Sequence, residues 1–256
     1  IQTVQNMNSI ETMADRLRVF LLLSVLIGVL LSVITGYFIA GNSIKPVQES
    51  MKQQKEFIAD ASHELRTPIT IMRTNLDVVK CSEDESVGSQ MEWIENAYRE
   101  TEHMQELVND LLQLAKNDAG TEEIHRQQIF ARRLCMEVVE RFRPIAEKKD
   151  IKLKFTCSAP SAILRADHQK LTQLLSIVAD NAIKYSGNGQ QVEFCLKRAG
   201  KNVVFEVTDN GIGIDESELE NIFNRFYRTD KARSRKEGGT GLGLAIAKQI
   251  AEAHGG

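Results

Sequence analysis

The chain has 256 residues, of which 42% are hydrophobic, and its formal net charge is −3. This length suffices for a membrane segment and two modest domains, and the balanced charge excludes a global basic field that would favour nucleic acid as a partner. The four cysteines lie far apart and show no zinc-binding spacing, so we expect free thiols. The sequence does not begin with Met, and we expect a chain truncated at both ends.

A long apolar segment dominates the N-terminal part, where residues 18–40 carry no charge after Arg18. A helix of about 20 apolar residues spans the bilayer core of roughly 30 Å, which predicts a transmembrane helix rather than a buried core helix. The lysines that follow it favour a cytoplasmic C-terminal side. Residues 1–17 are then a membrane-proximal segment, expected in the extracytoplasmic space, that is either the last helix of a sensor region or only a tail.

Residues 41–80 are predicted to continue as a helix, because apolar or small side chains recur at alternating steps of three and four. They are Ile44, Val47, Met51, Ile58, Ala61, Leu65, Met72, Leu76 and Val79. These residues form one apolar seam along the helix. His63 lies two residues from both Ala61 and Leu65 of this seam, which is about 200° of helical rotation, so its side chain points to solvent. The adjacent Glu64 can orient or deprotonate the imidazole. Pro68 lacks an N–H and should bend the helix beside the histidine.

A second helical pattern follows a polar turn over residues 81–89. Its seam is formed by Val87, Met91, Ile94, Tyr98, Thr101, Met104, Val108, Leu111 and Ala115. Two helices with one seam each leave apolar surface uncovered, and two copies bury it as a four-helix bundle, so we expect a homodimer. Residues 117–120 break the pattern and indicate a linker, which gives a dimerisation domain over residues 41–118.

Residues 119–256 form the second predicted domain, in which helical and strand periods alternate. We expect strands near 123–129 and at 151–156, helices at 132–148, 167–186 and 242–253, and a hairpin of strands 192–197 and 203–207. Helices combined with antiparallel strands suggest an α+β sandwich with helices on one sheet face. Asp167 is the predicted N-cap of its helix, and Gly187 the predicted stop.

Candidate binding residues gather in three places of this domain, although no GxxxxGK[ST] motif occurs, which excludes a P-loop. Asn181, Lys184 and Tyr185 share one helix face. Asp209 ends a strand and precedes glycines that permit close backbone approach. Glycines at 238–243 open a helix, whose free N–H groups suit phosphate. Each feature alone has an ordinary alternative, namely an amphipathic helix end, a turn, or a flexible linker.

Five segments in order resemble the boxes of sensor histidine kinases. They are the H-box Ser62-His63-Glu64-Leu65-Arg66-Thr67-Pro68, the N-box 180–186, the first glycine box 208–213, the F-box 222–228 and the second glycine box 238–244. The resemblance implies a multidomain protein, with a HisKA-type helical hairpin that dimerises as a four-helix bundle. It also implies an ATP-binding α+β sandwich of the GHKL, or Bergerat, type over residues 119–256, without the strands that usually follow its last helix.

The resemblance also implies a function, an ATP-dependent protein-histidine kinase that autophosphorylates His63 and passes the phosphoryl group to an Asp of a response regulator. Glu64 would be the general base, and Thr67 would position water when the regulator is dephosphorylated. Asn181 would hold Mg²⁺, and the other nucleotide-binding residues would be Lys184, Tyr185, Asp209, Gly211, Gly213, Gly239, Gly241 and Gly243. The expected location is a bacterial plasma membrane, with the protein in the lipid bilayer and the kinase domains in the cytoplasm.

Ile177 stands where many relatives have a further Asn, and the strands that usually follow the last helix are missing; these two departures from the family pattern keep alternatives open. Residues 41–62 leave no room for the HAMP relay module that often precedes the H-box, so we expect a nearly direct helical connection from the membrane segment. One alternative is a membrane-anchored, receptor-like dimer whose nucleotide domain is inactive. Another is an ATPase motor or chaperone of the same fold, which would leave the H-box unexplained. The basic segment 229–237 is either a mobile lid over the nucleotide or solvated surface.

Overall fold

The computed structural model describes residues 2–82, 84–119, 123–229 and 239–256. The chain divides into two units, residues 1–59 and residues 60–256. The first unit is the N-terminal part of helix α1 (Gln2–Cys81), which continues into the second unit. The helix begins at Gln2, so the segment that the sequence left open as helix or tail is helical.

The apolar part of α1 is unburied in the structure. Phe20 and Tyr37 are 73% and 80% exposed, and the apolar residues between them are exposed too. Among the described residues, α1 is the one helix long and apolar enough to cross a membrane, as judged by length and composition. Such a surface is unfavourable in water and favourable in the hydrocarbon core of a bilayer.

The second unit begins with a helical hairpin, in which residues 82–90 join α1 to α2 (Met91–Asp118). The side-chain amide of Gln90 donates to the carbonyl oxygen of Ser82 at 2.5 Å and closes this turn. Helix α2 buries Ala97, Leu107 and Leu114, whereas other apolar side chains of the hairpin remain exposed in a single copy. Val87 was predicted as the first seam residue, but it lies in the turn and is exposed.

The linker prediction needs a correction, because α2 extends through Asn117 and Asp118 and ends at the cap residue Ala119. Both side chains have partners: the Asn117 amide donates to Gln249, and the Asp118 carboxylate forms an ion pair with Arg225. These contacts favour continuing the helix past the point where its apolar period ends. Gly120 lies outside the described residues.

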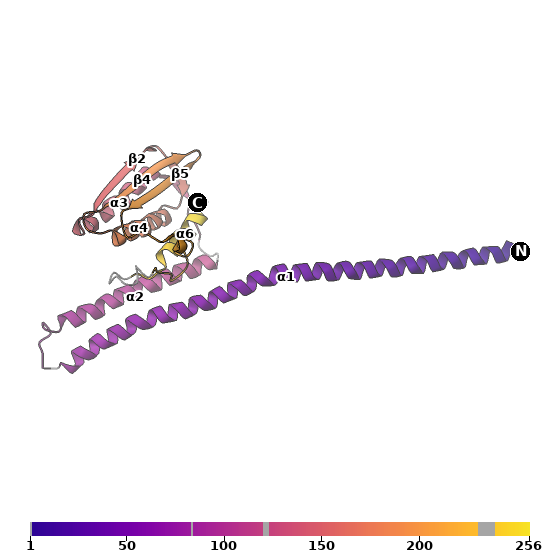
Figure 1. The fold of residues 1–256 in the computed structure, drawn as a ribbon, viewed down its shortest axis with the longest axis horizontal. Helices are drawn as coiled ribbons and strands as arrows, with labels where there is room; N and C mark the ends of the chain where they lie inside the picture. Colours follow the sequence, from indigo (N-terminus) through magenta and orange to yellow (C-terminus); the bar gives the residue numbers. More distant parts are fainter. Residues whose placement is uncertain (1, 83, 120–122, 230–238) are drawn as a thin grey trace. The chain divides into compact units, whose positions relative to one another are not determined.

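A three-stranded sheet, ordered β2-β4-β5, forms the centre of the C-terminal domain (Figure 1). Helices α3 (Ala131–Lys148) and α4 (His168–Tyr185) cover one face of this sheet. Because successive side chains of a strand point to opposite faces, Val192, Phe194 and Leu196 of β4 all enter the core, where they are fully buried. The remaining bounds are β2 (Lys152–Cys157), β4 (Gln191–Ala199), β5 (Asn202–Asp209) and α6 (Gly243–Ala253).

The sheet is mixed rather than antiparallel throughout. The predicted hairpin of β4 and β5 is confirmed, but β2 pairs with β4 in parallel, with Phe155 opposite Phe194. The chain between β2 and β4 contains a strand and α4, which is long enough for the crossover that parallel pairing requires. The assumption of antiparallel strands was therefore wrong for this pair.

A second, two-stranded sheet pairs β1 (Gln127–Phe130) with β3 (Ile163–Ala166). The first strand was predicted to begin near residue 123, but it begins four residues later. Strand β3 was missed altogether, because it is short and follows the turn-forming segment Ser158-Ala-Pro-Ser161.

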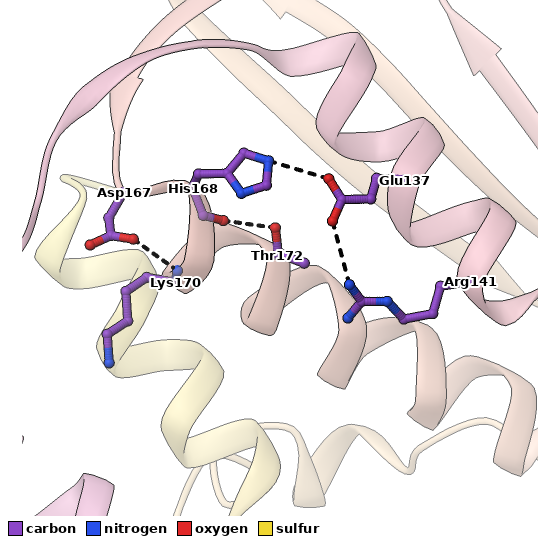
Figure 2. A network of polar contacts seen from close by, with 6 residues as sticks. All are labelled: Glu137, Arg141, Asp167, His168, Lys170 and Thr172. Atoms are coloured by element: carbon purple, nitrogen blue, oxygen red, sulfur yellow. Dashed lines mark hydrogen bonds and ion pairs between the residues drawn. The ribbon is translucent and has the colours of Figure 1, made fainter.

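Helix α4 is joined to α3 by a polar network near its N-terminus (Figure 2). Nε2 of His168 lies 3.3 Å from Oε2 of Glu137, and the other oxygen of this carboxylate accepts a hydrogen bond of 3.4 Å from Arg141. The hydroxyl of Thr172 donates to the carbonyl oxygen of His168 at 2.7 Å. The contact of His168 with Glu137 links the start of α4 to α3, and the other end of α4 carries the candidate binding residues.

Asp167 caps α4 as predicted and also holds the entering chain. Its carboxylate accepts the N–H of Lys170 at 3.1 Å, drawn in Figure 2, and the N–H of His125 at 3.0 Å. Burial acts to raise the pKa of Asp167, but hydrogen bonds from the backbone N–H groups of Lys170, His125 and Gln169 outweigh burial and lower it. The Asp167 N–H in turn donates to Nε2 of His254 at 3.1 Å, which ties α4 to the end of α6.

We predict that Asp167→Ala lowers the free energy of unfolding by about 1–2 kcal/mol at pH 7, because α4 loses its N-cap. A lowered pKa in the folded state means that the carboxylate stabilises the fold above its unfolded pKa of about 3.9, and that this contribution is lost as the pH falls through the folded value. The difference between the two proteins in denaturant titrations should therefore shrink in acid. Asp167→Asn, which keeps an N-cap acceptor, is the control with the smaller loss. Equal midpoints for Asp167→Ala and the parent at pH 7 would contradict this role.

Candidate functional site

The last two turns of α4 lie against the glycine segment that precedes α6. A Cβ atom on Gly243 would lie 3.2 Å from Cγ2 of Ile177, and one on Gly239 would lie 2.5 Å from Nζ of Lys184. Ile177, Asn181 and Lys184 are spaced by four and three residues and so share this face of the helix. The structure thus brings Lys184 together with residues 239–243, and Asn181 lies on the same helix face.

The turn after β5 adjoins the end of the same helix. The N–H of Ile212 donates to the carbonyl oxygen of Tyr185 at 3.3 Å, and a Cβ atom on Gly211 would lie 2.5 Å from that oxygen. Residue 211 must therefore be glycine for the two backbones to approach this closely. Oδ1 of the exposed Asp209 accepts the N–H of Gly211 at 2.8 Å, which holds the carboxylate on this turn.

The second glycine segment packs on the chain around Phe226. Gly241 has a φ of +68°, and a Cβ atom there would lie 2.9 Å from the backbone of Phe226, so only glycine fits both the conformation and the space. The hydroxyl of Thr240 accepts the N–H of Leu242 at 3.3 Å. The contact places part of segment 222–228, which resembles the F-box, against the second glycine segment. Most of the predicted lid, like Gly238, lies outside the described residues.

Three segments therefore converge: the end of α4, the turn 209–213 and the segment 239–243. Helix α6 begins at Gly243, and its first N–H groups have no partner within the helix, so they and the dipole favour an anion. Asp209 offers a hydrogen-bond acceptor, and Asn181 offers an amide oxygen of the type that binds Mg²⁺. These groups fit a nucleotide with its metal ion. Among the described residues, no three His, Cys, Asp or Glu side chains form a cluster that could hold a metal ion.

His63, Glu64 and Thr67 lie elsewhere, on the part of α1 that belongs to the second unit. All three are exposed, which confirms the prediction for His63 from the helical phase. Helix α1 continues through Pro68, which is buried, and Oγ1 of Thr67 lies 3.5 Å from the carbonyl oxygen of His63. The imidazole is thus open to solvent on a helix that does not contribute to the glycine-lined site.

Contacts of α2 with the C-terminal domain were not predicted. The hydroxyl of Thr240 donates to Asp110 at 3.1 Å, and the side-chain amides of Gln113 and Gln173 exchange two hydrogen bonds of 3.0 and 2.7 Å. Burial raises the pKa of Asp110, although the bond from Thr240 acts to lower it. The signal in the sequence was the polar series Asp110, Gln113 and Asn117, at spacings of three and four along one face of α2.

Comparison with known families identifies both parts of the second unit. A model described as "His Kinase A (phospho-acceptor) domain" matches residues 53–120, and one described as "Histidine kinase-, DNA gyrase B-, and HSP90-like ATPase" matches residues 166–256. The chain belongs to the sensor histidine kinases. The predicted family and the fold classes of this kinase, a helical hairpin and an α+β ATP-binding domain, are thereby confirmed.

Individual relatives agree with this identification. The kinase is 41% identical over 214 residues to "Sensor histidine kinase WalK" of Bacillus subtilis, covering 82% of this chain and 34% of that protein. It is 38% identical over 227 residues to "Sensor protein kinase WalK" of Staphylococcus aureus, covering 87% of this chain and 54% of that protein. The chain therefore spans about half or less of the length of these relatives.

A solved structure resembles this kinase in fold. The complex of histidine kinase ThkA with response regulator protein TrrA matches with a TM-score of 0.66 and 22% identity, covering 82% of this chain and 57% of that one. At this identity the likeness concerns the fold alone.

We predict that Gly211→Ala weakens ATP binding by about tenfold or more, equivalent to about 1.4 kcal/mol. The new methyl group would displace the carbonyl of Tyr185 or the carboxylate of Asp209, since both lie within 3 Å of its position. Equilibrium binding of ATP to the parent and the variant measures the effect. Gly187→Ala is a matched control, because a methyl group there would only touch the flexible side chain of Gln190 at 3.6 Å. Equal ATP affinity in Gly211→Ala would show that the close approach does not shape the site.

Proposed function

We propose that this histidine kinase uses Mg-ATP to phosphorylate His63 and then passes the phosphoryl group to an aspartate of a response regulator. The observation that carries the proposal is the convergence of α4 and two glycine segments on a site suited to a nucleotide, in a chain that also presents an exposed histidine within the matched phosphoacceptor domain. The full proteins to which the chain is related are named as sensor kinases.

Each part of the nucleotide has a partner in this proposal. Asp209 accepts a hydrogen bond from the amino group of adenine, with the turn through Gly211 and Gly213 beside the base and Tyr185 next to it. Lys184 and the N–H groups around Gly239, Gly241 and Gly243 bind phosphate oxygens. The amide oxygen of Asn181 would hold Mg²⁺, for which it is a suitable hard ligand. Because Ile177 packs on Gly243, it contributes van der Waals contact rather than a second amide.

Phosphoryl transfer requires a neutral imidazole with one free nitrogen. In the proposal, Glu64 draws the proton from one ring nitrogen of His63, and the other nitrogen attacks the γ-phosphorus. The new nitrogen–phosphorus bond forms as the bond to the bridging oxygen breaks, and ADP leaves with that electron pair. A Mg²⁺ ion held at Asn181 would supply positive charge close to the phosphate oxygens.

The partner proposed for the second step is a receiver domain with an acceptor aspartate. The fold neighbour ThkA was solved in complex with a protein named as a response regulator, the class of partner that we propose here. Thr67 lies one turn beyond His63 and shares its helix face, so it would meet the same partner. We propose that Thr67 positions water when the regulator loses its phosphate.

The proposal includes a membrane location and a dimer. The apolar segment of α1 would cross the plasma membrane of a bacterium, with both kinase domains in the cytoplasm. Exposed apolar side chains on the hairpin, such as Leu76, Val108 and Leu112, would be buried by the hairpin of a second copy. No contact with nucleic acid is part of this function.

We predict that His63→Gln abolishes the transfer of ³²P from γ-labelled ATP to the protein, with no loss of ATP binding. Label on the parent should be labile in acid and stable in base, as expected for phosphohistidine. Two of the other histidines already have partners, since His168 faces Glu137 and both ring nitrogens of His254 contact backbone groups. Undiminished labelling of His63→Gln would refute the assignment, and ATP binding without any label on the parent would favour the receptor-like alternative.

The matched control is Thr67→Ala, one turn further along the same exposed face. It should accept label at the rate of the parent, because Thr67 plays no part in the attack on ATP. Phosphate should leave the response regulator more slowly in its presence than with the parent. Identical decay with both proteins would remove Thr67 from the proposal.

We also predict that Asn181→Ala weakens the binding of ATP in Mg²⁺ by about ten- to a hundredfold, since an interaction with a charged group contributes roughly 1.5–3 kcal/mol. The effect should vanish when EDTA removes the metal, because only the metal-dependent part of the affinity passes through this side chain. Titration of both proteins with ATP, with and without Mg²⁺, measures it. A loss of equal size in EDTA would mean that Asn181 supports the fold of the site rather than the metal.

A further inference from the structure

Ser186 has a buried hydroxyl that the fold does not use. The residue follows the last residue of α4 and is 7% exposed. Its N–H donates to the carbonyl oxygen of Ala182 at 3.2 Å, but its hydroxyl forms no hydrogen bond with any described residue. A buried polar group without a partner is costly and uncommon in a folded protein. Such a group therefore suggests a partner that is absent from the protein itself.

The position of Ser186 is fixed by two backbone links to the turn that carries Asp209. On one side, the carbonyl oxygen of Tyr185 accepts the N–H of Ile212. On the other side, Val192 pairs directly with Asp209 in the sheet. The chain from 185 to 192 is thus held at both ends against residues 209–212, and Ser186 lies at the end closer to Ile212.

The chemistry of adenine explains what a hydroxyl could add there. The edge of the base presents an amino group, which donates, next to the ring nitrogen N1, which accepts. A carboxylate such as that of Asp209 can only accept, so it matches the amino group and leaves N1 without a donor. A serine hydroxyl is a donor that can rotate to meet N1 or a water bound to it.

We infer that Ser186 is a further nucleotide-binding residue, whose hydroxyl donates a hydrogen bond to N1 of the adenine base directly or through one water. Together with Asp209 it would recognise both groups on this edge of the base. The inference rests on the proposed function, since it assumes that adenine lies at Asp209.

The test compares Mg-ADP with Mg-1-deaza-ADP, in which a C–H group replaces N1, on the full chain in detergent or nanodiscs. ADP carries the base without the phosphoryl group that is transferred, so binding is measured without turnover. Ser186→Ala should bind ADP about five- to tenfold more weakly than the parent, the size expected for one neutral hydrogen bond. The parent should lose a similar factor on 1-deaza-ADP, and Ser186→Ala should lose nothing further on that analogue.

A second readout separates binding from folding. Because the hydroxyl has no partner in the nucleotide-free protein, Ser186→Ala should unfold at the same temperature as the parent or a higher one when no nucleotide is present. Ser176→Ala is the matched control: its hydroxyl also lacks a partner among the described residues, but it lies almost three turns earlier in α4. This control should bind ADP as the parent does.

Several results would overturn the inference. Equal ADP affinity of Ser186→Ala and the parent would do so. If Ser186→Ala binds ADP and 1-deaza-ADP more weakly than the parent by the same factor, the substitution disturbs the site in general and the inference also fails. A lower unfolding temperature of nucleotide-free Ser186→Ala would assign the hydroxyl a structural role. If the parent binds no ADP at all, the proposed function fails together with the inference, and this outcome differs from the others.

Discussion

The close approach of two backbones at the end of α4 is the constraint on which the candidate site depends. The carbonyl oxygen of Tyr185 accepts a hydrogen bond from Ile212 and leaves no space for a side chain at position 211. This contact holds the carboxylate of Asp209 next to the helix that carries Asn181 and Lys184. A larger residue at position 211 would separate the acceptor for the base from the groups proposed for the phosphates and the metal ion.

Helix α4 also connects this site to the point where the chain enters the domain. At its N-terminus, the carboxylate of Asp167 accepts the N–H of His125, and the backbone N–H of the same residue donates to His254 at the end of α6. The start of α6 lies in the glycine segment that faces Lys184. Both ends of α6 therefore contact α4, so the N-cap and the binding site are connected through the same pair of helices.

The sequence predicted those features that depend on local chemistry. The helical period placed His63 on the exposed face, Asp167 was recognised as an N-cap, and the hairpin of β4 and β5 followed from alternation around a turn. Strand β3, the parallel pairing of β2 with β4 and the contacts of α2 with Thr240 and Gln173 involve residues far apart in sequence, so no local period reports them. The unused hydroxyl of Ser186 likewise becomes visible only when burial and partners are known.

The central claim is that the end of α4, the turn 209–213 and the segment 239–243 form one nucleotide site. Hydrogen–deuterium exchange of the full chain, with and without Mg-ADP, tests this claim most directly, because it reports each segment separately. The account predicts that ADP slows amide exchange in all three segments over the same range of concentrations, with little change around β1 and β3. Protection of only one segment, or protection centred on another part of the domain, would contradict it.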